Sequence, residues 1–440
     1  MSLRFARVLL WACALVSPLP GWAAAPDFAG SWNVTVRFGA ESQSAVMELT
    51  QSDGKYQGQS GPLDEGGHFG LNLQGTLVGK KLRLIPAFGK VNPEAVGALD
   101  IEIRDQKLVG SGKLYGVAVT LSGERPEEKA RAPKTHEFVP TKYITTLSAR
   151  NEPVLHIYPG DSVKTTTVDA YGKNEKNEWV TMPGNSHTGP FYIEGAMPGD
   201  TLVVHLARVR VNQSSARMWC KSLNPNALPA RIAPEGSKSC DWNWTLDAES
   251  NVAKPTSPTA KLKNFKVALR PMIGSIGVAA PAYQAIAAGD LGMHGGNLDY
   301  NRIVEGTTVY FPVFRAGALF SLGDAHAVQG DGEITGQGLE TSMAVEFKVD
   351  LIKGKASTFP WAEDAEYVMF SGIGNSVDNA LQAATAGIVE WLKDRYQLEI
   401  GEIAQVLGTS IQYDIAEVVD ARPHVVAKLR KDLLSQIEKP

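Results

Sequence analysis

The stretch MPGDTLVVHLARV, residues 197–209, places Pro-Gly-Asp directly before a run in which apolar and polar residues alternate. Pro, Gly and Asp favour a tight turn, and a period of two is typical of a strand with one buried face. The same unit occurs as YPGDSVKTTTVDA at 158–170, with a looser copy in VEGTTVYFPVF. Repeated turn-then-strand units predict a β-sandwich, and we assign Asp161 and Asp200 to turns rather than to catalysis.

Residues 26–127 have a different rhythm. Short stretches such as GSWNVTVRF, GLNLQGTLVG and KLVGSGKLYG are separated by turn residues about every ten positions. This spacing predicts a small antiparallel barrel or sandwich, in which we find no catalytic grouping. Charged, proline-bearing residues 128–137 follow without periodicity, which indicates a linker. We therefore expect a second, larger domain over 138–440.

The end of the chain changes to a helical period. Apolar residues three or four positions apart define one face of a helix expected over 376–392, with Ser376 as its N-cap. These residues are Val377, Leu381, Ala384, Ile388 and Trp391. A second short helix is expected over 399–407, before strands in SIQYDIAEVVD and HVVAKL. The predicted fold class is mainly β, with a few C-terminal helices.

Residues 1–25 have the features of an export signal. Arg4 and Arg7 precede the apolar run VLLWACALV, and the small residues of GWAAA follow. The expected location is the periplasm or the cell exterior. No other apolar run is long enough for a membrane span, so none is expected in the mature chain. Lys and Arg number 43 against 47 acids, and without a basic run nucleic acid is not an expected partner.

Two cysteines, Cys220 and Cys240, remain once the signal is removed. Disulfides form and persist in oxidising compartments outside the cytoplasm. We therefore predict that these two residues pair, with two unrelated buried thiols as the alternative.

Two stretches in the second domain, GMHGGNLDYN and SLGDAHAVQGDGE, concentrate histidines and acids. In the first, adjacent glycines let the backbone turn so that His294 and Asp299 converge. In the second, Asp324 and His326 are two positions apart, which places both side chains on one face of a strand. Imidazole and carboxylate on one face form a metal-ligand arrangement, and a hydrogen-bonded pair without an ion is the alternative.

We expect both stretches to meet in one pocket. A strand over 307–314 is predicted to return through 318–322 as an antiparallel hairpin, which would bring the two stretches to one edge of a sheet. A shared ion, or two adjacent ions, requires that His294 and His326 lie within roughly 10 Å, given ligand bonds of about 2 Å and two-metal spacings near 4 Å.

From about residue 138 to 429, the chain resembles the acetamidase/formamidase family. The motifs, in order, are TGPFYIEGAMPGDTL, GVAAP, HGGNLD, VYFPVFRAGALFSLGDAHAVQGDGEITGQGLET and SVDNALQAATAGIVEWL. The resemblance implies a β-sandwich hydrolase that cleaves the C–N bond of small linear amides, such as formamide or acetamide, to ammonia and a carboxylate. The signal and the N-terminal β domain depart from the family pattern. So does the section 212–263, which we interpret as an insertion beside the matching blocks.

The residues favour a metal-dependent mechanism. No serine-lysine pattern occurs, bridged cysteines supply no thiolate, and Ser321 lacks a nucleophile-elbow pattern. A bound cation lowers the pKa of water to roughly 7 and polarises the amide carbonyl, so no side-chain nucleophile is required. The predicted ligands, or residues directly around them, are His294, Asn297, Asp299, Asp324, His326 and Glu340. Zinc is the expected ion, with calcium the alternative if oxygen ligands predominate.

Two carboxylates are predicted to be catalytic, Asp324 and Glu194. Glu194 is expected to move a proton from water to the departing ammonia, with a solvated strand residue as the alternative. Asp169 and His187 are weaker additions to the site. Residues expected to shape and support the turn are Gln329, Asp331 and Glu333.

Two other functions stay open at this point. The second domain is compatible with a non-catalytic protein that binds a small ligand or a cell-envelope partner on an amidase scaffold. It is also compatible with a hydrolase of a larger amide, which the section 212–263 would admit. A homo-oligomer is a further open possibility.

Overall fold

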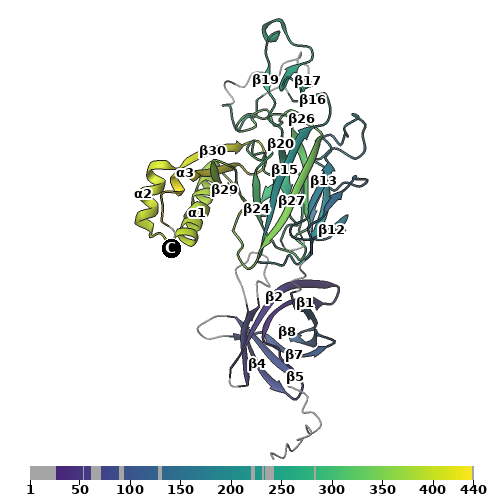
Figure 1. Cartoon of the computed structure of the whole chain (residues 1–440), viewed down its shortest axis with the longest axis vertical. Coiled ribbons are helices and arrows are strands. Elements are labelled where there is room, and N and C mark those ends of the chain that lie inside the picture. Colours follow the sequence, from purple (N-terminus) through teal and green to yellow (C-terminus); the bar gives the residue numbers. More distant parts are fainter. Residues whose placement is uncertain are drawn as a thin grey trace, which may run out of the picture.

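The structure, a computed structural model, describes residues 26–438 except 53, 61–70, 89–93, 127–130, 220–222, 230–231, 233–241 and 282–283. The expected export signal lies outside the described residues, as do Cys220 and Cys240. The described chain forms a small β-barrel and a larger β structure, with helices along one side of the larger part (Figure 1).

The N-terminal region is an antiparallel barrel, as its sequence rhythm predicts. Its strands are β1 (Gly30–Phe38), β2 (Glu41–Ser52), β3 (Lys55–Ser60), β4 (Leu71–Val78), β5 (Lys81–Phe88), β7 (Gly97–Arg104), β8 (Lys107–Leu114) and β9 (Val117–Glu124). Pairing of β4 with both β3 and β5 closes the ring, and β6 (Glu94–Ala95) is a short addition to β5. Buried and exposed residues alternate along β1, so that Trp32 and Val34 point into the core.

The larger region contains two extended sheets. The first has, in spatial order, β10 (Thr135–Glu137), β13 (Ser162–Thr166), β27 (Met343–Ile352), β15 (Thr201–Val211), β24 (Thr308–Pro312), β28 (Trp361–Glu363), β29 (Tyr367–Ile373), β31 (His424–Arg430) and β30 (Gln412–Glu417). Because β10 pairs with β13, the last residues of the expected linker already belong to this sheet.

The second sheet carries most of the candidate site. Its main path is β19 (Val267–Ala268), β18 (Val252–Pro255), β17 (Asn243–Asp247), β16 (Ser215–Arg217), β26 (Glu340–Thr341), β25 (Phe320–His326), β20 (Met272–Gly277), β23 (Gly295–Asn297) and β22 (Leu291–Gly292). Strand β14 (His187–Ile193) also pairs with β25, and β12 (Leu155–Ile157) pairs with β14. Strands β16 to β18 come from the section 212–263 and extend this sheet. A separate pair joins β11 (Thr146–Ser148) to β21 (Ala285–Ala287).

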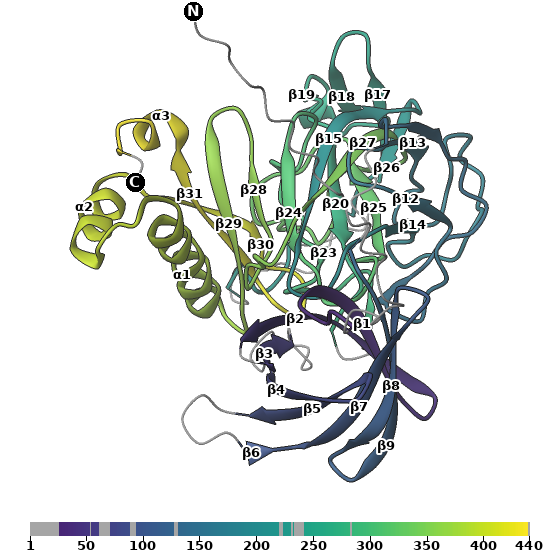
Figure 2. The same ribbon diagram turned by 60° about the horizontal axis from the view of Figure 1, so that its bottom comes forward.

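The two sheets pack face to face through a shared apolar core. Phe191 and Phe320, from the second sheet, contact Phe347 on β27 of the first, with ring centroids 5.3 and 5.1 Å apart. All three rings are fully buried. The expected β-sandwich is therefore confirmed, and Figure 2 shows the barrel against one end of it.

The Pro-Gly-Asp segments form turns, as their composition predicts. The Asp161 carboxylate accepts hydrogen bonds from the backbone N–H groups of Tyr158 and Lys134. The Asp200 carboxylate similarly accepts from the N–H groups of Met197 and Gly354. Both carboxylates are buried, because these bonds replace their hydration.

Of the two longer helices, α1 (Val377–Tyr396) lies beside β29 and β31, and α2 (Ile400–Ser410) lies next to α1 on the side away from these strands (Figure 1). The short helices are η1 (Ala260–Leu262) and α3 (Lys431–Leu434). Ser376 caps α1 as predicted, because its hydroxyl accepts the N–H of Asn379. No helix in the described part of the chain is long and apolar enough to cross a membrane.

The buried face of α1 differs from the predicted one. Val377 and Leu381 are 38% and 39% exposed, so their assignment to the core is wrong. The predicted residues Ala384 and Ile388 are fully buried, and Ala380 joins them where a Cβ atom on Gly372 would collide with the helix backbone. Helix and strand approach so closely here that only small residues fit between them.

The predicted hairpin between β24 and β25 is also wrong. The two strands belong to different sheets, because the chain crosses the sandwich between them. Gly317, Ala318 and Leu319 have consecutive φ values of 78°, 55° and 56°, a left-handed run that redirects the backbone. The two histidine-bearing stretches still meet, since β23 pairs with β20 and β20 pairs with β25.

Candidate active site

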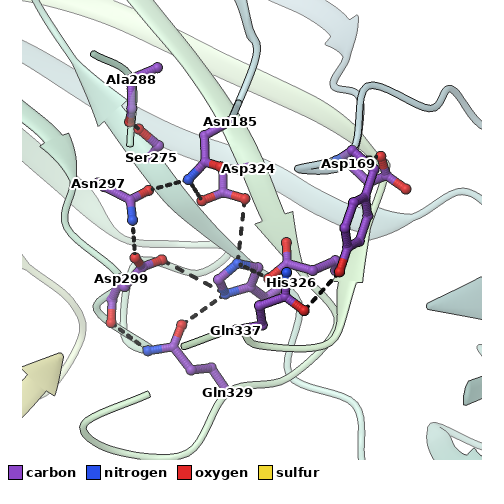
Figure 3. Close-up of polar contacts among 12 residues, drawn as sticks. Asp169, Asn185, Ser275, Ala288, Asn297, Asp299, Asp324, His326, Gln329 and Gln337 are labelled. Atoms are coloured by element: carbon purple, nitrogen blue, oxygen red, sulfur yellow. Dashed lines mark hydrogen bonds and ion pairs between the residues drawn. The ribbon is translucent and has the colours of Figure 1, made fainter. Parts of the chain in front are cut away.

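His326, the last residue of β25, lies at the centre of a buried polar cluster (Figure 3). Its Nε2 is 3.2 Å from Glu340 Oε1 and 3.6 Å from Asp324 Oδ1. Its Nδ1 is 2.8 Å from Gln329 Oε1. Because Gln329 Nε2 donates to the Asp299 carbonyl, Gln329 Oε1 accepts from His326 Nδ1–H. His326 Nε2 is thereby directed at the two carboxylates.

The sheet register brings these three side chains together. Glu340 on β26 is the direct antiparallel partner of His326, and directly opposed residues share a face of the sheet. Asp324 is two residues before His326 and has a left-handed φ of 50°, so a distorted part of β25 carries this pair. Glu340, 14 positions after His326 in sequence, thus joins the Asp324–His326 pair through the pairing of β25 with β26.

Two overlapping groups have the chemistry of a cation site. The first contains Asp324, His326 and Glu340, and the second contains Asp299, His326 and Glu333. Within each group the potential ligand atoms lie within 4.8 Å of one another, and every residue is buried. Of the predicted ligand set, the structure therefore brings together Asp299, Asp324, His326 and Glu340, and it adds Glu333, which we expected only to support the turn.

Asn297 lies among these acids but has its amide fully engaged. Its Oδ1 accepts from Asn185 Nδ2 at 3.0 Å, and its Nδ2 donates to Asp299 Oδ2 and Asp420 Oδ2. Asn185 also donates to Asp324 Oδ2 at 2.7 Å (Figure 3). These contacts orient the carboxylates around His326, so Asn297 acts here as an organiser of potential ligands.

Asn185, Glu417 and Asp420 were not predicted from the sequence. Asn185 is two positions before His187 and Asp420 is three after Glu417, but neither segment contains the repeated glycine, histidine and acid pattern that identified the other two stretches. Only the fold brings them to the cluster, where Glu417 Oε2 accepts the backbone N–H of Asp420. The short spacings to His187 and Glu417 are the only local signals that could have identified Asn185 and Asp420.

Burial dominates the electrostatics of the carboxylates. It raises the pKa of Glu340 to about 8 and that of Glu417 to about 8. The pKa values of Asp299 and Glu333 also lie well above their ordinary range, because both are buried beside other acids. Burial opposes the charge of His326, but the adjacent carboxylates, Glu340 first, raise its pKa well above the usual value. These acids therefore tend to retain their protons, and a cation placed among them would favour their ionised form.

Several buried atoms in this cluster have no hydrogen-bond partner among the described residues. They are His294 Nε2, Asp299 Oδ1, Asp324 Oδ1, His326 Nε2 and Glu340 Oε2. A buried polar atom without a partner costs free energy unless something satisfies it. Carboxylate oxygens and an imidazole nitrogen are ligands that zinc accepts, so the residues present fit a divalent cation.

His294 belongs to neither three-residue group. It is buried, which lowers its pKa to about 4, and the nearest charges acting on it are those of Asp290 and Arg422. Those two side chains form an ion pair at 2.7 Å. No contact among the described residues joins His294 to His326, so the sharing of an ion between them stays a prediction.

His187 makes a buried relay with two serines. Ser275 Oγ donates to the Ala288 carbonyl and therefore accepts from His187 Nε2–H. The other ring nitrogen, Nδ1, is then free to accept from Ser321 Oγ–H at 2.9 Å. Ser321 thus has a histidine partner, which sequence reasoning did not give it. Burial lowers the pKa of His187 to about 4, which makes it a weak base.

The remaining two candidate acids differ in position. Asp169 is buried, its Oδ1 accepts the N–H groups of Tyr171 and Lys173, and burial raises its pKa to about 6. Asp324 is among the charges acting on it, which places Asp169 beside the cluster. Glu194 instead bonds the exposed side chain of His156 at 2.7 Å, beyond the far end of β14. The structure does not bring Glu194 to the cluster.

A formamidase and an acetamidase are among the known proteins similar in sequence to this chain. The model of the Acetamidase/Formamidase family matches residues 242–431. A formamidase of Methylophilus methylotrophus is 32% identical over 160 residues, which is 31% of this chain and 38% of that protein. An acetamidase of Mycolicibacterium smegmatis is 32% identical over 159 residues, with 30% and 38% covered. The match thus spans well under half the length of these relatives.

Solved structures extend the similarity over the whole sandwich. A predicted acetamidase/formamidase of Thermoanaerobacter tengcongensis has a TM-score of 0.60 and 28% identity, covering 70% of this chain and 99% of that one. An acetamidase of Bacillus halodurans has a TM-score of 0.58 and 27% identity, covering 68% and 99%. The part of the chain that follows the barrel is therefore similar in sequence and fold to acetamidases and formamidases.

Proposed function

We propose that this protein is a metal-dependent hydrolase of linear amides, which converts an amide and water to a carboxylate and ammonia. The observation that carries the proposal is the group of Asp324, His326 and Glu340, buried and with unpartnered ligand atoms. The family match supplies the expected reaction. We propose zinc as the ion, with calcium as the alternative because carboxylates outnumber imidazoles in the cluster.

The three proposed ligands are His326 through Nε2 and the carboxylates of Asp324 and Glu340. Asp299 and Glu333 are the proposed ligands of a second ion, or the acids that orient the first. When bound, a divalent cation lowers the pKa of a water molecule and polarises the amide carbonyl. Gln329 holds His326 by accepting its Nδ1–H, and Asn185 holds Asp324, so both ligands are oriented by fixed hydrogen bonds.

Asp169 replaces Glu194 as our proposed proton carrier. A pKa of about 6 lets its carboxylate take a proton from the attacking water near neutral pH and then donate it to the departing nitrogen. Backbone N–H groups hold Oδ1, whereas Oδ2 has no hydrogen bond within the described chain and is the atom proposed to carry the proton. The C–N bond breaks as that nitrogen leaves as ammonia.

Ser321 is the competing nucleophile because His187 accepts its proton. A histidine with a pKa of about 4 is a poor base at neutral pH, and both residues are fully buried within the sheet. We expect Ser321→Ala to retain most of its amide hydrolysis. Loss of activity in a variant with normal folding and metal content would restore the serine mechanism.

Metal analysis of the purified protein, combined with ammonia release from formamide, acetamide and longer amides, tests the proposal. We expect bound metal in stoichiometric amount and turnover of at least one amide. A metal-loaded protein that binds small amides without cleaving any of them would instead support the non-catalytic alternative. Export to the periplasm or cell exterior, the Cys220–Cys240 disulfide and a homo-oligomer remain separate proposals.

A further inference from the structure

Arg217 lies next to the proposed metal ligands. It is the last residue of β16, and its direct antiparallel partner is Glu340 on β26. Glu340 is in turn opposite His326, so the three residues form a row across adjacent strands. Directly opposed side chains leave the same face of a sheet, with Cβ atoms about 5 Å apart. The guanidinium of Arg217 therefore projects from the same side as the catalytic cluster.

Aromatic rings surround this guanidinium. Its central carbon is 4.9 Å from the ring centroid of Tyr171 and 5.8 Å from that of Trp242. Trp242 packs against Trp219 at 4.7 Å. Gln337 ties the group together, because its Oε1 accepts both Tyr171 O–H and the backbone N–H of Trp219, each at 2.8 Å. The cation is held in a defined place by planar groups rather than by an acid.

Arg217 has no ion pair or hydrogen bond within the described part of the chain. Its Nε is buried without a partner, while the residue as a whole stays partly exposed. Burial is the main cause of the raised pKa of the Tyr171 phenol, and the charges of Glu340 and Arg217 also act on it, in opposite directions. A fixed, partly desolvated guanidinium without a carboxylate partner favours a carboxylate from a ligand.

We infer that Arg217 binds the carboxylate of an amide substrate whose reacting end lies at the Asp324, His326 and Glu340 group. The substrate class is a short amido acid, with an amide at one end and a carboxylate at the other. This inference rests on the proposed amide hydrolysis and adds to it the recognition of charge. Arg217 is a specificity residue here, because it contacts the non-reacting end of the substrate.

The acidic surroundings explain why such a residue is needed. Where Asp169 is ionised, its negative charge repels an anionic substrate, and the guanidinium of Arg217 on this side offsets that repulsion. A neutral amide such as acetamide would need no guanidinium to bind. An unpaired, partly desolvated arginine beside the site would then lower the stability of the protein without contributing to substrate binding. The rings of Tyr171 and Trp242 keep water from one side of the guanidinium, which strengthens its interaction with a carboxylate.

Matched substrates separate charge recognition from size. The metal-loaded protein is assayed with succinamate and butyramide, which differ mainly in a terminal carboxylate or methyl group, and with glutaramate and valeramide. We expect kcat/KM to be at least about tenfold higher for each charged member, the ratio expected of a charge-assisted hydrogen-bonded pair. In Arg217→Gln this ratio falls to about one, whereas Arg217→Lys keeps part of it.

Arg208→Gln is the control, because Arg208 is an exposed arginine on β15 of the other sheet. It should leave the charged-to-neutral ratio unchanged. An equal fall in kcat/KM for charged and neutral amides in Arg217→Gln would show that Arg217 only balances the acids, and would overturn the inference. The inference would also be overturned if the unmodified protein cleaves neutral amides with the same kcat/KM as their charged counterparts.

A binding measurement distinguishes this inference from the proposed function. Succinamate should raise the melting temperature of the metal-free protein, and butyramide should not, with the difference lost in Arg217→Gln. If no amide is cleaved but this pattern holds, the hydrolase proposal fails and the carboxylate site stands. If amides are cleaved and the pattern is absent, the hydrolase proposal stands and the inference about Arg217 is wrong.

Discussion

The barrel and the sandwich bury different kinds of side chain. The barrel core consists of apolar residues such as Trp32, Leu82 and Ile101, and among its described residues only Ser60 is a buried polar one. The sandwich buries an apolar core of the same kind and, beside it, a set of histidines and acids that includes His187, Asp299, Glu340 and Glu417. Both regions use antiparallel strands with alternating faces, so the fold class alone does not explain the difference.

The buried acids of the sandwich lower the stability of its fold, whereas the barrel core has no comparable cost among its described residues. Burying a carboxylate without a counter-charge is unfavourable, and the raised pKa values of Glu340 and Glu417 record that cost. The barrel has no such cluster in its described residues, and nothing in its core calls for an ion. Function is therefore expected to depend on the sandwich, and the predictions below test that division.

Removal of metal is the strongest test of the difference. We expect chelation to abolish amide hydrolysis and added zinc to restore it, because our proposed mechanism has no metal-free nucleophile. The melting temperature of the sandwich should fall as well, since an ion bound only by the folded state stabilises that state. Full activity in a sample shown to contain no metal would contradict the claim that the buried acids of the sandwich hold a catalytic ion.

Replacement of one ligand is the next test. His326→Ala should lower metal content and amide hydrolysis together, by at least about a hundredfold in activity, because loss of even an outer partner of a ligand costs 10 to 100-fold. The control is His205→Gln, since His205 is on β15 of the other sheet and, among the described residues, its side chain bonds Thr308. Equal losses in both variants would indicate general destabilisation rather than a metal site.

Glu417 offers a test through pH. Burial, with Asp420 beside it, raises its pKa from 4.5 to about 8. Between these values the unfolded chain releases a proton that the folded chain retains, so stability falls as pH rises through the window. Glu417→Gln should remove a slope of up to about 1.4 kcal/mol per pH unit from the free energy of unfolding of the metal-free protein.

Urea unfolding at several pH values between 5 and 8 measures this slope. The exposed Glu390 on α1 provides the matched control, and Glu390→Gln should leave the slope as it is. Identical slopes in the two variants and the unmodified protein would mean that Glu417 does not retain its proton in the folded state. The buried acids of the sandwich would then lower the free energy of unfolding less than we expect.

Periodicity predicted the parts of the fold in which local pattern determines burial. Alternation along β1 and the Pro-Gly-Asp turns predicted the barrel and the sandwich, and Ser376 predicted the start of α1. Periodicity failed where contact between segments distant in sequence determines which residues are buried. The close approach of Gly372 buries Ala380 together with the predicted Ala384 and leaves Leu381 exposed, and no pattern within the helix predicts where a neighbouring strand lies.

The candidate site divides in the same way. Asp324 and His326 are two positions apart, so their proximity could be predicted locally, although the left-handed φ of Asp324 departs from a regular strand. Glu340 joins them through the β25–β26 register, and Asn185 and Asp420 come from other parts of the chain. The misplaced hairpin has the same origin, because the left-handed run from Gly317 to Leu319 sends β24 and β25 into different sheets.

Deletion of the barrel should have the smallest effect of all. The charge of Glu124, at the end of β9, acts on Tyr192 near the far end of β14, which places the barrel beside that end. His187 begins the same strand next to Gly323 and the cluster, roughly 15 Å away at the usual rise per residue.

A protein lacking residues 26–127 should therefore keep kcat/KM within about threefold, since a change of this size corresponds to less than 1 kcal/mol. A truncated protein that is folded and loaded with metal but inactive would show that the barrel contributes to the pocket or to assembly, and that the division between an inert barrel and an active sandwich is wrong.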